Sequence, residues 1–219
     1  MPAAALPEVE IQHGQTVDDG GFGFRSGGRD ESRGRGRPEV PVNSYRLGLW
    51  FGLGAILMLF VAFTSAYIYR QGLSFDWQPL SPLPILWFNT AVLVLSSLTF
   101  EGARRALRHD LTTSFGRWLG VTTLLGVTFL VGQYMAWAQL AARGVFLGTN
   151  PHSSFFYVLT ATHAVHLLGG VLALGYVMQG SLHQKYTSRS CTAVEVTAVY
   201  WHFMDGLWIY LFLLLFLWR

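Results

Sequence analysis

Ionisable side chains interrupt two of the most apolar stretches of the chain, residues 160–170 and residues 200–205. The ionisable members are His163 and His166 in the first stretch and His202 and Asp205 in the second. An ionisable group at the centre of a bilayer costs about 2.5–3.5 kcal/mol on insertion scales, so such groups usually face other protein groups or water. The two stretches therefore predict a place where the protein pairs polar groups internally.

The spacing within each stretch puts the ionisable groups on common helix faces. His163 and His166 are three residues apart, as are His202 and Asp205, and residues at this spacing are neighbours on a helix surface. If the two stretches belong to antiparallel neighbouring helices, His166 and Asp205 each lie about 16 Å into their spans and are level near the midplane. Glu195 falls on the same side as His202 but nearer one end. A His–Asp pairing across the two helices is geometrically allowed, and it would relieve the burial of Asp205.

Three kinds of chemistry fit this cluster of His163, His166, Glu195, His202 and Asp205. The two histidine-containing spacings supply enough ligands for zinc or iron, but a di-iron bundle needs several more inward carboxylates. A proton or substrate path is the second possibility, although the other apolar runs have almost no ionisable residue at depth. The interpretation that we adopt is a structural polar cluster that holds the two helices together.

The composition indicates a membrane protein. Hydrophobic residues make up 52% of the 219 residues and charged residues only 12%, about half the charge of a typical soluble protein. Five apolar runs are each long enough for a hydrocarbon core about 30 Å thick, which needs about 20 helical residues. The runs cover about residues 45–69, 83–100, 115–140, 155–178 and 194–218. Because backbone groups in lipid must bond internally, the predicted fold class is an all-α membrane protein, a five-transmembrane-helix bundle over residues 43–219.

Basic residues gather on one side of this topology. That side receives Arg25, Arg29, Arg33, Arg35, Arg37, Arg46, Arg104, Arg105, Arg108, Arg117, Lys185 and Arg189, and the other side receives Arg70, Arg143 and Arg219. Since basic residues concentrate in cytoplasmic segments, we predict that the N-terminus is cytoplasmic and the C-terminus external. The asymmetry also accounts for the net charge of +3, so nucleic-acid binding is not needed to explain it.

Residues 1–42 form a Gly- and Arg-rich tail with few large apolar groups. Such a segment buries too little surface to offset its conformational entropy, so we predict a disordered cytoplasmic tail. Beside the first span its arginines would be attracted to anionic lipid headgroups, at about 1 kcal/mol per basic residue, or would dock on a partner subunit. The single cysteine, Cys191, excludes an internal disulfide.

Close helix packing is predicted at six glycines. They are Gly48, Gly52, Gly116, Gly120, Gly169 and Gly170. The first two pairs repeat the G-x-x-x-G spacing, and in lipid small residues let helix backbones approach each other. Packing within the chain is the interpretation that we adopt, with oligomerisation as the alternative.

At its two polar stretches the chain resembles subunit III of haem–copper oxidases, the cytochrome c oxidase and quinol oxidase family. The family signature H-G-L-H-V-x-x-G is matched by residues 163–170, with Ala164 in place of the usual glycine. The last-helix signature E-x-x-x-x-Y-W-H-F-x-D-x-x-W is matched by Glu195, Tyr200, Trp201, His202, Phe203, Asp205 and Trp208. The resemblance covers residues 45–219, and the short bacterial members have five spans with the amino end inside.

The resemblance implies a subunit with no catalytic, cofactor-binding or metal-ligating residues of its own. Haem and copper would lie in partner subunits I and II, where oxygen is reduced and protons are pumped. Subunit III in this family contacts subunit I, holds phospholipids against it and sustains proton uptake. The expected location is the bacterial cytoplasmic (inner) membrane, within a respiratory complex.

Two further expectations follow from the resemblance. Arg104, Arg105 and Arg108 would suit a phospholipid headgroup, although anchoring at the membrane interface explains them equally well. The family's first shared helix often has a buried glutamate, and the matching position here is Ile56. A role tied to that carboxylate is therefore not expected in this chain.

Two alternatives remain open at the level of sequence. One is a subunit III-like partner of a quinol oxidase or of a nitric oxide reductase, because the electron donor is bound by other subunits. The other, from a different class, is a small stand-alone transporter or channel that uses the His/Asp cluster. Helices broken by Gly or Pro at mid-span would favour the transporter, and no proline interrupts the core of any predicted span.

Overall fold

A computed structural model of the chain describes residues 42–73, 83–148, 150–183, 186 and 191–216. These residues form five α-helices, each long and apolar enough to cross a membrane, which confirms the predicted fold class. The helices are α1 (Val42–Leu73), α2 (Pro84–Arg108), α3 (Thr112–Ala142), α4 (Pro151–Leu182) and α5 (Thr192–Phe216). Residues 1–41 of the predicted disordered tail lie outside the described residues, whereas Val42 begins α1. Lys185, Arg189 and Arg219, which entered the orientation argument, also lie outside them.

Local sequence explains where several helices begin and end. Asn150 opens α4 with a capping box, in which its side chain accepts a hydrogen bond from the Ser153 N–H and the Ser153 hydroxyl accepts one from the Asn150 N–H. Pro84 occupies the first turn of α2, where a missing N–H costs nothing. Gly144 follows α3 with a φ of 76°, a left-handed conformation that favours glycine.

Helix α2 continues eight residues beyond the predicted end of its span at residue 100. The prediction ended the span where charged residues begin, but a helix need not stop at the edge of the lipid. Glu101 lies one turn from Arg104 and Arg105 and forms ion pairs with both, at 2.7 and 3.9 Å. Such pairs stabilise an exposed helix end, so α2 presents its basic residues from a regular helix.

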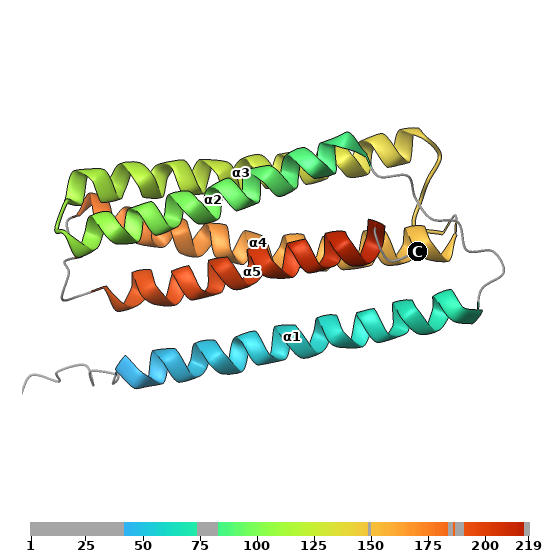
Figure 1. Cartoon of the computed structure of the whole chain (residues 1–219), viewed down its shortest axis with the longest axis horizontal. Helices are drawn as coiled ribbons and strands as arrows, with labels where there is room; N and C mark the ends of the chain where they lie inside the picture. The colour runs from blue at the N-terminus through green and yellow to red at the C-terminus, as the bar shows by residue number, and fades with distance from the viewer. Residues whose placement is uncertain (1–41, 74–82, 149, 184–185, 187–190, 217–219) are drawn as a thin grey trace, which may run out of the picture. The chain divides into compact units, whose positions relative to one another are not determined.

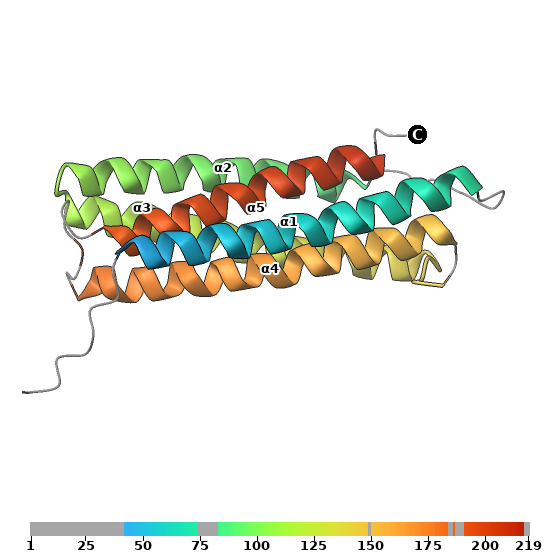
Figure 2. The same ribbon diagram turned by 90° about the horizontal axis from the view of Figure 1, so that it is seen from below.

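The first helix is attached differently from the other four. Among the described residues, α1 contacts only α4 and α5, whereas α2 packs along α3 and also meets α5. Figure 2 shows α1 running alongside α4 and α5. Its buried seam consists of Leu53, Phe60, Thr64 and Tyr67. Most other apolar side chains of α1 are exposed, including Trp50 at 65%, and are left for lipid or another subunit.

The five helices alternate in direction, so their ends fall into two sets. Figure 1 shows the start of α1, the end of α2, the start of α3, the end of α4 and the start of α5 at one end. We call this the basic end, because it holds Arg46, Arg104, Arg105, Arg108 and Arg117. Of the described arginines, only Arg70 and Arg143 lie at the opposite end. The charges therefore separate as predicted; which end faces the cytoplasm stays a prediction.

The predicted packing glycines divide into two groups. Gly116 lies opposite Ser181, Gly120 opposite Met178, and Gly169 and Gly170 lie opposite Tyr200. At Gly48 and Gly52 an added Cβ would meet nothing within 4 Å in the described part of the chain. The interpretation of Gly48 and Gly52 as contacts within the chain is thus corrected, because α1 turns a different face towards α4 and α5.

Candidate functional site

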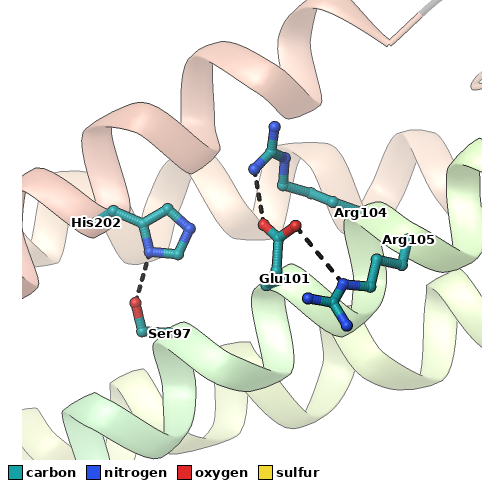
Figure 3. A network of polar contacts seen from close by, with 5 residues as sticks. All are labelled: Ser97, Glu101, Arg104, Arg105 and His202. Carbon is teal, nitrogen blue, oxygen red and sulfur yellow. Dashed lines mark hydrogen bonds and ion pairs between the residues drawn. The ribbon is translucent and has the colours of Figure 1, made fainter.

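The predicted polar cluster does not form one site; its members point to different neighbours. On α5, His202 reaches α2, where its Nδ1 shares a hydrogen bond of 2.5 Å with the Ser97 hydroxyl. Figure 3 shows this pair beside the Glu101 carboxylate and the two arginines that Glu101 binds. The Phe100 ring lies 6.2 Å from the His202 ring, centroid to centroid. His202 thus connects α5 to α2 rather than to α4.

Asp205 lies one turn further along α5, inside the bundle, and is only 4% exposed. Its carboxyl group faces the Ser97 side chain. Neither carboxyl oxygen accepts a hydrogen bond from any of the described residues. A buried carboxylate without hydrogen bonds is strongly disfavoured when ionised, so burial favours the neutral form of this group.

The two histidines of α4 are not paired with Asp205. His163 is fully buried, 5.2 Å from the Trp208 ring and 6.1 Å from the Phe129 ring, and neither of its nitrogens has a hydrogen-bond partner within the described segments. His166 bonds through Nδ1 to the Thr162 carbonyl of its own helix, at 2.7 Å. The His–Asp pairing that the sequence allowed is therefore absent between these residues. Within the described ranges, no three His, Cys, Asp or Glu residues lie close enough to hold a metal ion.

Glu195 lies at the basic end, away from the other members of the cluster. Its Oε2 forms an ion pair of 2.8 Å with Arg46, which joins the start of α5 to the start of α1. Two pockets meet at this residue. The first basic-end pocket, of about 210 Å³, is lined by Arg104, Leu107, Arg108, Cys191, Val194 and Glu195. The second, of about 290 Å³, is lined by Arg46, Leu49, Trp50, Arg104, Glu195, Val196 and Val199.

The three arginines predicted to meet a headgroup separate in the structure. Arg104 lines both basic-end pockets and Arg108 lines the first. Arg105 has a side chain that is 75% exposed and turns to Glu101. The second pocket gains Arg46 from α1 instead, which the sequence did not single out because it lies far from α2 along the chain. Several guanidinium groups around two small pockets suit an anion such as a phosphate.

A third pocket lies between α1 and α5 at mid-depth and is called the central pocket here. It has a volume of about 450 Å³ and is lined by Leu57, Phe60, Val61, His202, Phe203, Gly206, Leu207 and Tyr210. The wall is almost entirely apolar, with the His202 imidazole and the Tyr210 phenol as its polar groups. The Tyr210 hydroxyl donates to Thr64 of α1 at 3.1 Å. The second basic-end pocket and the central pocket thus lie along the same pair of helices.

Sequence reasoning missed the α2 residues that complete the site. Ser97 and Glu101 are four residues apart, so they share a helix face that points towards His202. A serine and a glutamate on one face of an apolar helix are a weak signal, because a serine in a membrane helix commonly bonds only its own backbone. The contact of Ser97 with His202 on α5 is what shows that these two residues belong to the site.

The Cys191 thiol yields a test of the geometry at the basic end. Burial, then the neighbouring Glu195 carboxylate, which accepts its hydrogen bond at 3.7 Å, raise the pKa of this thiol. The thiolate is the reactive form, so we expect slow alkylation by a maleimide at neutral pH and a rate that rises into the alkaline range. Glu195→Gln should speed the reaction a few-fold at neutral pH. An unchanged rate in this variant would show that Glu195 does not act on the thiol.

The comparisons with known proteins agree on one family. A family model described as cytochrome c oxidase subunit III matches residues 42–219. The cytochrome c oxidase subunit 3 of Thermostichus vulcanus is 31% identical over 175 residues, covering 78% of this chain and 86% of that protein. The protein of the same name from Synechocystis is 32% identical over 187 residues, covering 83% and 77%. A probable cytochrome c oxidase subunit 3 from Mycobacterium tuberculosis is 32% identical over 178 residues, covering 78% and 86%.

Proposed function

Because the chain belongs to the haem–copper oxidase subunit III family, we propose that it packs against subunit I of a respiratory terminal oxidase as a non-catalytic subunit. In this role it stabilises subunit I, holds phospholipid beside it and sustains proton uptake, while haem and copper lie in subunits I and II. The complex would lie in the bacterial cytoplasmic membrane, where five apolar helices anchor this chain.

The lipid part of this proposal is supported by two pockets that are both lined by residues of α1 and α5. The second basic-end pocket is lined by Arg46, Arg104 and Glu195, so its net charge is positive and would suit a phosphate near the ends of the helices. The central pocket continues along the same two helices with apolar walls from Leu57, Phe60 and Val61. A phospholipid with its phosphate at the basic end and an acyl chain along the α1–α5 groove matches both chemistries.

The proposal is tested by purifying the tagged chain from its own membranes in mild detergent. The eluate is examined by mass spectrometry and by a reduced-minus-oxidised visible spectrum. Stoichiometric haem together with a large multi-span partner is the expected result, and the haem type and electron donor would separate a cytochrome c oxidase from a quinol oxidase or a nitric oxide reductase. A colourless preparation of this chain alone would overturn the proposal and favour a stand-alone transporter.

Arg104→Gln should weaken lipid retention by the purified complex. Arg104 lines both basic-end pockets, and a basic residue near an anionic surface is worth about 1 kcal/mol, so roughly fivefold less anionic phospholipid should remain bound. The measurement is native mass spectrometry of lipid adducts after a fixed detergent wash. Arg105→Gln is the matched control from the same helix turn, because its side chain is exposed. Equal losses in the two variants would place the lipid elsewhere.

A further inference from the structure

Asp205 is the buried group that the proposed function leaves without a task. It lies inside the bundle on α5, and no described residue donates a hydrogen bond to either of its carboxyl oxygens. Taking an unpaired carboxylate into an apolar interior is far more costly than taking in the neutral acid. The geometry therefore favours the proton-bearing carboxylic acid at this position.

The groups around Asp205 leave the carboxyl without a counter-ion. On its own helix the titratable neighbour is His202, and on α2 the charged groups near this depth are Glu101, Arg104 and Arg105. Glu101 is already paired with both arginines. On α4, His163 and His166 lie against aromatic rings. In the described segments of α1 and α3, the residues at this depth are apolar or hydroxyl-bearing. Among the residues that the structure describes, no full positive charge is therefore directed at Asp205.

Ser97 links Asp205 to the basic half of the bundle. Its hydroxyl shares a hydrogen bond with His202 Nδ1 on one side, and the Asp205 carboxyl faces it on the other. A serine hydroxyl can donate one hydrogen bond while accepting another, which is what passing a proton between two groups requires. His202 in turn lies near Glu101 and Arg104, on the side of the basic end.

Aromatic side chains lie on the other side of Asp205. Trp208 lies one turn beyond Asp205, is 2% exposed and packs edge-on against Phe129 with ring centroids 4.8 Å apart. Its indole N–H donates to Thr90 at 3.1 Å, which fixes the ring across the bundle. A proton on Asp205 therefore has a polar neighbour on the side of the basic end and an aromatic barrier on the other side.

We infer that Asp205 is a proton-storing site at the centre of the bundle, which exchanges its proton with water through Ser97 and His202 on the side of the basic end. When the site releases its proton, the Asp205 O–H bond breaks as a new Ser97 O–H bond forms. The original Ser97 proton passes to His202 Nδ1, and His202 releases its Nε2 proton to a water molecule. One proton leaves, one carboxylate remains, and the reverse sequence reloads the site. The site stores a proton and does not conduct it across the membrane.

Infrared difference spectroscopy of the purified protein tests this inference. The spectrum of the natural protein minus that of Asp205→Asn should contain the carbonyl band of a protonated carboxyl group at neutral pH. The band should shift promptly after transfer to heavy water. The inference would be overturned if the spectrum showed that Asp205 is ionised at neutral pH. It would also be overturned if the carbonyl band exchanged as slowly as the amide groups of the core. Neither outcome requires a further variant.

The relay is tested by removing its members. Ser97→Ala and His202→Phe should keep the band but slow its exchange by about 100-fold, the lower end of what a positioned proton-transfer group contributes. Ser97→Thr retains the hydroxyl and should restore fast exchange. Thr99→Ala is the matched control on α2, since the Thr99 hydroxyl bonds Thr122 and the carbonyl of Ser96. The route would be refuted if the Asp205 carboxyl proton exchanged in both relay variants as fast as in the natural protein. Because the readout is vibrational, it stands whether or not the chain purifies with haem-containing partners.

Discussion

Replacing Trp201 with alanine is expected to remove this chain from the purified complex. Trp201 is fully buried and occupies a gap that two glycines leave open. An added Cβ would lie 2.7 Å from the Trp201 ring at Gly126 of α3 and 3.2 Å from it at Gly170 of α4. The indole N–H also donates to the Ser96 hydroxyl of α2 at 3.0 Å. One side chain therefore joins α5 to three other helices, and its loss should cost about 3–5 kcal/mol.

The measurement is the fraction of complexes that retain the chain after mild heating in detergent, compared with expression level in the membrane. Trp118→Ala is the matched control, because Trp118 is a tryptophan of α3 that is 45% exposed and lines none of the pockets described above. The control should retain the chain nearly as well as the natural protein. A Trp201→Ala variant that remains bound to the same temperature would show that the four-helix contact is not what holds α5.

Gly132→Val is expected to be almost as damaging, through overpacking instead of a cavity. Helices α2 and α3 form the most extensive contact in the bundle. At Gly132 an added Cβ would overlap the side-chain amide of Asn89, which is itself fully buried on α2. Because Asn89 is buried, relieving the overlap displaces its amide within the core or moves the helices apart, and we expect a cost of about 3 kcal/mol, the upper end of the usual range for overpacking.

The Gly132→Val variant is compared with Gly175→Val on α4, where a Cβ would meet nothing within 4 Å in the described structure. Both changes put the same valine side chain in the middle of a membrane helix. Differences in helix propensity and side-chain hydrophobicity therefore cancel when the two variants are compared. Limited proteolysis of the membrane-embedded chain measures the separation of α2 and α3. Equal protease resistance in the two variants would contradict the close approach of these helices. A second change, Asn89→Ala, should partly restore Gly132→Val, because it removes the side chain that the new methyl groups meet.

Much of the fold was predictable because it depends on composition along one segment at a time. Each span needed only a sufficiently long apolar run, and all five runs became helices. The apolar run predicted a span to about residue 100 but did not predict how far the helix continues beyond it, which depends on the ion pair of Glu101 with Arg104.

The site was less predictable because it depends on how helices rotate about their own axes. The sequence placed His163 and Asp205 at compatible depths, but nothing in it specified which helix each would face. His163 turned to the Phe129 and Trp208 rings, while Asp205 turned to Ser97 on α2. Small residues decided these rotations: Gly126 and Gly170 admit the Trp201 ring, and that ring fixes the orientation of α5. Spacing patterns for metal ligands or ion pairs do not contain that information.

The attachment of α1 has a consequence for how the protein is made. Its packing partners α4 and α5 emerge from the ribosome last, and about a hundred residues separate the end of α1 from the end of α4. At roughly 5–20 residues per second, α1 therefore spends about 5–20 s in the bilayer before even the first of its partners, α4, is complete. During that interval Thr64 and Tyr67 face lipid instead of protein. A membrane chaperone or protease that surveys nascent helices would meet α1 first, and the rate of translation becomes a determinant of how much of this subunit survives to assemble.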